Sequence, residues 1–162
     1  MKPLSVRGVR IDRMAGTPVV TLREEDTPRR QFEIFIGAPE AAAIKTALEG
    51  EKTPRPLTHE LLINALEQLT FDVDHVVLTH VSAGTYFAEL VIVGEHGDQT
   101  RVSARPSDAI AIALRASCPV YASEALLEMV GEVVEEDDSV PNDEILDEFR
   151  DFIENISPED FE

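Results

Sequence analysis

The sequence predicts an α+β fold in which helices pack against one antiparallel or mixed sheet. Two groups of segments alternate apolar and polar residues, as half-buried strands do, and glycine-containing turns separate the segments. Each group is followed by a segment with apolar residues at helical spacing. A chain of 162 residues that is 43% hydrophobic is long enough for one compact domain, which buries about 70% of its unfolded surface.

The first half predicts a three-stranded group and two helices. Residues 4–12 and 17–23 read as a hairpin, and residues 31–36 (QFEIFI) as a third strand that ends at Gly37. Residues 40–48 are rich in alanine and predict a helix that packs closely. After a linker rich in charge and proline, residues 58–69 predict an amphipathic helix. The residues of its apolar face are Leu61, Leu62, Ala65, Leu66 and Leu69.

The second half predicts an antiparallel meander followed by a core helix. The three strands are expected at residues 73–81, 85–93 and 99–103. The helix at residues 107–115 is apolar on most sides, which indicates a position in the core. A short strand at 119–121 and a short helix at 123–130 complete a domain that spans residues 1–131.

Residues 132–162 form an acidic C-terminal extension. The chain carries a net charge of −18, and the segment from Glu124 onward accounts for −15 of it, so the rest is near neutral at −3. A near-neutral body can still display a local basic patch that binds phosphate. An amphipathic helix is expected from Asn142 to about residue 155, with Ile145, Phe149, Phe152 and Ile153 as its apolar stripe. We expect this stripe to dock on the body or on a second copy, and the loop at residues 135–138 to stay mobile.

Composition excludes several other classes of protein. No apolar run approaches the ~20 residues of a membrane span, and the N-terminus lacks the apolar region of a signal peptide. We therefore expect no membrane partner. The single Cys118 cannot form an internal disulfide, so we expect a buried thiol and a cytoplasmic location. The sequence contains no CxxC, HExxH, P-loop or GxSxG motif.

An arginine–proline pair stands just before a hydroxyl residue and a helix at two places in the chain. The segments are RPLTHELL (residues 55–62) and ARPSDAIAIALR (residues 104–115). Proline keeps Arg55 and Arg105 extended, and Thr58 and Ser107 are residues of the N-cap type. An arginine beside a helix N-terminus suits an anion such as phosphate, so we expect Arg55 and Arg105 to line one cleft. The recurrence also suggests an internal duplication.

Five blocks resemble the bifunctional nuclease domain family in order and spacing, over about residues 6–131. They are IGAPEAAAI, RPLTHELL, TYFAEL, ARPSDAIAIALR and PVYASEALL. The family comprises small bacterial proteins with plant relatives, credited with DNase and RNase activity, and the acidic extension resembles that of actinobacterial members. The resemblance implies that DNA or RNA is the substrate. One departure is Glu60, which stands where the family commonly has Asp.

Phosphodiester hydrolysis requires an activated water and groups that neutralise the phosphate charge. The candidates for acid–base work are His59, Glu60 and Asp108, because imidazole has an unperturbed pKa of about 6.5 and carboxylates accept protons. The candidates for holding phosphate are Arg55, Thr58, Arg105, Ser107 and Arg115. Glu40, Glu60 and Asp108 are the candidate ligands if a divalent metal such as Mg²⁺ or Mn²⁺ takes part.

Two alternatives to a nuclease remain open. The same arginines and helix termini suit a non-catalytic module that binds a nucleotide, RNA or a phosphorylated metabolite. The matched blocks, interpreted as packing signatures, also suit an oligomeric interaction protein. In each case we expect a homo-oligomer, most simply a twofold dimer, because the sheet has edges that must be covered.

Overall fold

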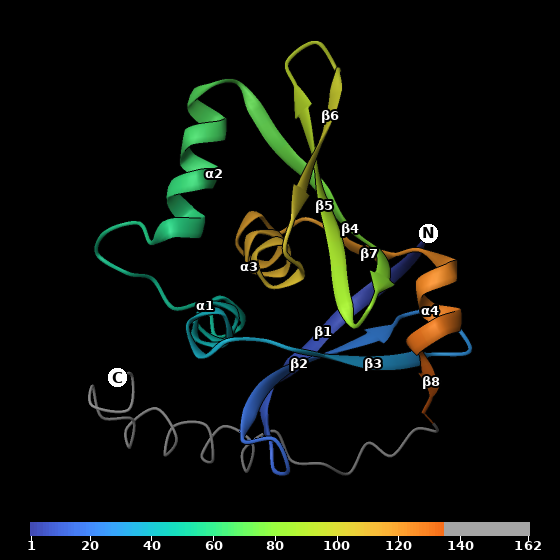
Figure 1. Cartoon of the computed structure of the whole chain (residues 1–162). Coiled ribbons are helices and arrows are strands. Elements are labelled where there is room, and N and C mark those ends of the chain that lie inside the picture. The colour runs from blue at the N-terminus through green and yellow to red at the C-terminus, as the bar shows by residue number, and fades with distance from the viewer. Residues whose placement is uncertain (135–162) are drawn as a thin grey trace.

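The computed structural model describes residues 1–134, and these form an α+β fold with one mixed sheet of eight strands (Figure 1). The order of strands across the sheet is β6-β5-β4-β7-β1-β2-β3-β8. All neighbours are antiparallel except β4 and β7, which are parallel. The predicted α+β class is therefore confirmed, and the sheet is of the mixed kind.

The first unit is a meander of three strands followed by a helix. It consists of β1 (Lys2–Asp12), β2 (Thr17–Glu24), β3 (Arg30–Phe35) and α1 (Ala38–Leu48). A loop then leads to α2 (Thr58–Gln68). These elements agree with the predicted ones to within two residues at most ends.

The second unit repeats this order of elements. It consists of β4 (Phe71–Ser82), β5 (Thr85–Gly94), β6 (Gln99–Ala104) and α3 (Pro106–Ala116). The short strand β7 (Val120–Ala122) lies between β4 and β1 and thereby joins the two meanders into one sheet. The helix that corresponds to α3 in the first unit is α1. The two arginine–proline segments precede α2 and α3, so they do not mark equivalent positions of a repeat.

The chain then adds α4 (Glu124–Val130) and β8 (Glu132–Val133). Ser123 caps α4, because its hydroxyl accepts a hydrogen bond from the backbone N–H of Leu126 at 3.1 Å. Strand β8, which the sequence did not predict, pairs with β3 at the edge of the sheet. The expected helix at residues 142–155, its apolar stripe and the loop at 135–138 lie outside the described residues.

The core lies between the sheet and the helices α1 and α3. Helix α3 is buried through most of its length, as predicted, and Ile110 is fully enclosed. Helix α1 brings Ala41 and Ile44 into the same core, and its alanines allow close approach to α3. Helix α2 lies beside α3 at the outside of this layer (Figure 1). No helix in residues 1–134 is long and apolar enough to span a membrane.

The predicted apolar face of α2 does not enter the core. Of its five residues, Leu66 packs against the core, whereas Leu61, Leu62 and Leu69 are exposed. Ile63 also packs inward, so α2 contacts the body through a neighbouring face. Helical spacing identified the stripe correctly but could not tell which side meets the body, because α2 is apolar on two sides.

Candidate active site

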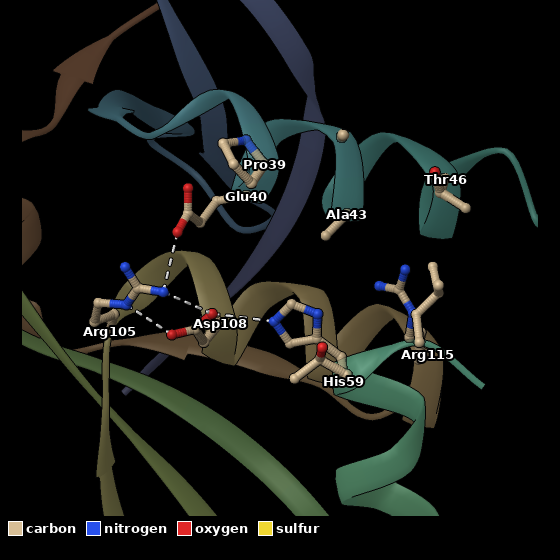
Figure 2. Close-up of a pocket in the computed structure, with 11 residues that line it drawn as sticks. Pro39, Glu40, Ala43, Thr46, His59, Arg105, Asp108 and Arg115 are labelled. Carbon is tan, nitrogen blue, oxygen red and sulfur yellow. Dashed lines mark hydrogen bonds and ion pairs between the residues drawn. The ribbon is translucent and has the colours of Figure 1, made fainter. Parts of the chain in front are cut away.

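A pocket of about 420 Å³ lies where α1, α3 and the start of α2 meet (Figure 2). It combines a wall of small side chains from α1 with charged side chains from α2 and α3. The lining residues are Pro39, Glu40, Ala42, Ala43, Thr46, Leu57, Thr58, His59, Arg105, Asp108 and Arg115. Six of them are candidates that the sequence also indicates: Glu40, Thr58, His59, Arg105, Asp108 and Arg115.

The turn from β6 into α3 positions Arg105 and Asp108. Pro106 holds the preceding residue out of the helical region, and Arg105 is extended as expected, with φ −70° and ψ 142°. Arg105 is therefore the N-cap residue and Pro106 the first residue of the helix, a position that proline favours. The prediction that Ser107 caps this helix is wrong, because the helix already begins at Pro106 and Ser107 is its second residue. Ser107 is buried and does not line the pocket.

The start of α2 positions Thr58 and His59. The N-cap residue is Leu57, and the side chain of Glu60 reaches back so that its Oε2 accepts a hydrogen bond from the Leu57 N–H at 3.0 Å. A glutamate at the third helical position commonly satisfies the helix start in this way. The prediction that Thr58 caps α2 is therefore wrong, and Glu60 performs that task from the third position. Thr58 is exposed and lines the pocket.

Four side chains form a continuous polar chain across one end of the pocket (Figure 2). Glu40 Oε1 lies 3.0 Å from Arg105 Nη2. Arg105 donates from Nε to Asp108 Oδ2 at 2.8 Å and from Nη2 to Oδ1 at 3.2 Å. Asp108 Oδ1 also lies 3.0 Å from His59 Nε2. The chain links α1, α3 and α2, so it fixes three helices relative to one another.

These contacts keep Asp108 ionised. Partial burial opposes its negative charge, but the hydrogen bonds from Arg105 and His59 outweigh that effect, so the pKa of Asp108 is lowered. An ionised carboxylate accepts a hydrogen bond from Nε2–H of His59 and thus favours the tautomer whose Nδ1 carries a free lone pair. In Figure 2 this second ring nitrogen points toward the side of the pocket where Arg115 lies.

Arg115 places a buried cation at the other end of the pocket. Its side chain is only 7% exposed. Nη1 donates to the carbonyl oxygen of Ala111 at 3.2 Å, and Nε lies 3.5 Å from Glu60 Oε1. Nε and Nη2 nevertheless have no hydrogen-bond partner within residues 1–134. Buried N–H groups without partners are costly, so this guanidinium is suited to an acceptor that enters the pocket.

Three other predicted residues lie outside the lining. Arg55 is exposed in the loop before α2, Ser107 faces the core, and Glu60 holds the start of α2 and Arg115. The sequence did not indicate that Ala42, Ala43 and Thr46 of α1 would form a wall. The alanine run of α1 predicted close packing, but it did not show that two of these alanines would face a pocket.

The carboxylates of the site do not converge on a single point. Among the described residues, no group of three or more His, Cys, Asp and Glu side chains is arranged to hold a metal ion. Glu40 and Asp108 contact Arg105 from two sides, whereas Glu60 lies against Arg115.

The fold and the pocket define a class of α+β domain in which two meander–helix units enclose a histidine, an aspartate and a buried arginine between their helices. The chain belongs to the bifunctional nuclease domain family, whose family model matches residues 20–135.

Individual relatives agree with this assignment. A protein of Mycobacterium tuberculosis described as uncharacterized is 35% identical over 166 residues, which cover 99% of this chain and 98% of the relative. A rice protein named bifunctional nuclease 2 is 26% identical over 122 residues, which cover 74% of this chain and 38% of the relative. Its namesake in Arabidopsis thaliana is 25% identical, with coverage of 74% and 37%. The plant proteins therefore share this domain within longer chains.

Proposed function

We propose that this protein hydrolyses phosphodiester bonds of DNA or RNA in the pocket between α1, α2 and α3. The observation that carries the proposal is the position of Arg115. A buried guanidinium with two N–H groups that make no hydrogen bond within residues 1–134 lines the same pocket as a histidine hydrogen-bonded to an aspartate. The names of the plant relatives support the choice of nucleic acid as the substrate.

Arg115 binds the phosphate in this proposal. Nε and Nη2 lie on one edge of the planar guanidinium, and such an edge matches two oxygens of a phosphate. Thr58, at the mouth of the pocket, offers a hydroxyl, and Arg55 in the exposed loop offers a cation for a neighbouring phosphate. The small side chains of Ala42 and Ala43 leave room for the sugar–phosphate backbone between the helices.

His59 acts as the general base. A water molecule attacks phosphorus, its proton passes to Nδ1 of His59, and the bond from phosphorus to the leaving oxygen breaks. The leaving oxygen then takes up a proton, and the imidazolium returns its own proton to solvent. Asp108 stabilises the positive imidazolium and holds the ring, which is the role that a carboxylate commonly has beside a catalytic histidine.

Arg105 and Glu40 are positioning residues in this scheme. Both oxygens of Asp108 accept hydrogen bonds from Arg105, and Glu40 holds the far side of the same guanidinium. Because its N–H groups already serve two carboxylates, Arg105 is less available to a substrate phosphate than Arg115 is.

A divalent ion such as Mg²⁺ or Mn²⁺ is compatible with the proposal if a substrate phosphate supplies oxygens beside Glu40 or Asp108. The near-neutral body permits an approach by nucleic acid despite the net charge of −18. The single free Cys118 is consistent with a reducing cytoplasm as the place of action.

The test is a cleavage and binding assay on labelled single-stranded DNA and RNA, with and without EDTA. Residual cleavage by His59→Gln reports on contaminating nuclease, and the matched control is His80→Gln, which changes an exposed histidine outside the pocket. We expect cleavage by the wild type and by the control variant. Binding without cleavage would instead favour a non-catalytic nucleotide-binding or RNA-binding module, and the absence of both would favour an interaction protein.

A further inference from the structure

Helix α2 presents an exposed apolar face on the side away from the body. Leu57, Leu61, Leu62 and Leu69 are 44%, 59%, 41% and 66% exposed. The residues through which α2 packs on the described body, Ile63 and Leu66, lie on its other side. Surface helices of monomeric proteins normally place charged residues on the side away from the core, so a second apolar face indicates a partner.

The exposed face carries no charge. At 100° per residue, the side chains of Leu61, Leu62, Ala65 and Leu69 fall within an arc of about 100°. Thr58 and Gln68 lie in or beside the same arc and are uncharged. The two glutamates of α2 lie elsewhere: Glu60 reaches the Leu57 N–H, and Glu67 is on the opposite side of the helix from Ala65.

The spacing of this face is symmetric. Leu61, Ala65 and Leu69 form a ridge of residues four apart, with the smallest side chain at its centre. If two such helices cross antiparallel at Ala65, Leu61 of each meets Leu69 of the other, and the alanines permit close approach. A surface that is complementary to itself in this way is what a twofold interface requires.

We propose that α2 is the contact between two copies of this chain, related by a twofold axis that passes close to Ala65. The self-complementary spacing of the ridge favours a second copy over other partners, and the lack of charge on this face permits it. Two molecules that each carry −18 repel one another, and an uncharged face is where that repulsion is least. An anionic lipid surface is a poor alternative, because membrane-surface helices carry Lys or Arg beside their apolar face and α2 has neither.

This arrangement places the interface beside the proposed catalytic pocket. The first turn of α2 supplies Leu57, Thr58 and His59 to the pocket lining, and the next turn begins the interface. In an antiparallel pair the two pockets lie at opposite ends of the contact. Eleven residues of helix span about 16 Å, so about one helix length separates the two pockets along the contact.

The test is the mass of the full chain in solution, measured by light scattering at high micromolar concentration. We expect about twice 17.9 kDa for the wild type and 17.9 kDa for the double variant Leu61→Glu/Leu69→Glu. The matched control is Met14→Glu, which adds a charge at a residue that is 99% exposed and distant in sequence, and it should remain dimeric. Thermal unfolding of the variants shows that they are folded.

A cross-linking experiment locates the axis. In a Cys118→Ser background, Ala65→Cys should form a disulfide-linked dimer under mild oxidation, whereas Glu67→Cys on the opposite side of α2 should not. A wild-type mass of 17.9 kDa at high concentration would overturn the proposal, because the face would then be covered within one chain or by another partner. Dimers that survive Leu61→Glu/Leu69→Glu, or cross-linking through residue 67 in preference to residue 65, would also overturn it.

Discussion

Arg115 has a buried guanidinium that is incompletely hydrogen-bonded within residues 1–134; Arg23 shares this feature, but only Arg115 lines the pocket. Its buried Nε and Nη2 have no hydrogen-bond partner within the described part of the chain, although Glu60 lies 3.5 Å away. An unsatisfied buried donor costs about 1–3 kcal/mol. Unsatisfied buried donors are tolerated where they serve binding. An anion in the pocket would accept hydrogen bonds from these N–H groups and remove their energetic cost.

Replacement of Arg115 by methionine separates binding from stability. We expect Arg115→Met to change the melting temperature little, because loss of the 3.5 Å ion pair with Glu60 offsets the removal of buried N–H groups that make no hydrogen bond within residues 1–134. Its affinity for an oligonucleotide should fall about tenfold or more, which corresponds to about 1.4 kcal/mol. The measurements are thermal unfolding and fluorescence anisotropy. A large loss of stability with unchanged affinity would show that Arg115 is structural.

Cys118 illustrates a residue that has no place in the site. It is partly buried rather than fully buried as the sequence suggested, and burial raises the pKa of its thiol to about 11. About one molecule in a thousand carries the thiolate at pH 8, so alkylation by iodoacetamide should be about a hundredfold slower than for free cysteine. Mass spectrometry over a time course measures this rate. Modification as fast as that of free cysteine would contradict the assignment.

Part of the site could be predicted from residue types. The proline after Arg105 predicted the extended backbone of that arginine. The position of Asp108 in the sequence predicted that its carboxylate lies in the first turn of α3, near Arg105. The contact of His59 with Asp108 joins residues 49 positions apart on two helices, and only the packing of α2 beside α3 creates it. The N-cap of α2 is Leu57, one residue before the predicted Thr58, because Glu60 binds that helix start. The N-cap of α3 is Arg105, two residues before the predicted Ser107, because Pro106 is the first helical residue.

At the scale of elements, a buried ion network joins β1, β2, β3 and α4. Glu24 of β2 is 1% exposed, and Arg30 of β3 donates to both of its oxygens, at 2.8 and 3.0 Å. Lys2 of β1 lies 3.8 Å from Glu24, and Arg30 reaches Glu124 of α4 at 2.8 Å. The network fixes α4 to the sheet edge next to β8.

This network makes stability depend on pH. The hydrogen bonds from Arg30 lower the pKa of Glu24 below its usual value of 4.5. Its contribution is therefore fully present above about pH 4.5 and is lost as the pH falls through the lower folded-state pKa. We expect Glu24→Gln to cost about 3 kcal/mol at neutral pH and to reduce the loss of stability in acid. The measurement is urea unfolding at several pH values.

Glu33→Gln is the matched control for that experiment. Glu33 also pairs with an arginine, Arg10, but both side chains are about one third exposed. Water screens such a pair, so the control should cost less than about 1 kcal/mol. Equal losses in the two variants would show that burial of the Glu24 network adds nothing.

Periodicity predicted the helices and strands of residues 1–130 well, because nearly every one of them has a face that meets the core. It failed at two kinds of place. Strand β8 has two residues, both exposed, so it has no alternation of apolar and polar side chains from which a strand could be predicted. In α2 two apolar faces compete, and the sequence alone does not say which one meets the body and which remains for a partner.

At the scale of the whole molecule, charge is distributed unevenly. Residues 135–162 carry a net charge of −12, whereas residues 1–134 carry −6. At ~0.15 M salt the Debye length is about 8 Å, so the acidic segment can repel nucleic acid only if it lies close to the pocket.

Truncation after Val134 tests this and keeps β8 in the sheet. If the acidic segment competes with the substrate, the truncated protein should bind an oligonucleotide more tightly than the full chain at low salt and about equally at high salt. Titrations at two salt concentrations measure the difference. Equal affinities at low salt would remove any regulatory role, and a fall in melting temperature alone would indicate a structural role for the segment.

Hydrolysis by this protein, as proposed, depends on proton transfer at His59. The most direct measurement is the single-turnover cleavage rate of a labelled oligonucleotide by the wild type, His59→Gln, Asp108→Asn and the double variant. We expect His59→Gln to lose about 10²–10⁴ in rate while it still binds the oligonucleotide. Because Asp108 acts through His59, the double variant should be no slower than His59→Gln alone. Cleavage by His59→Gln at the wild-type rate would show that His59 is not the general base.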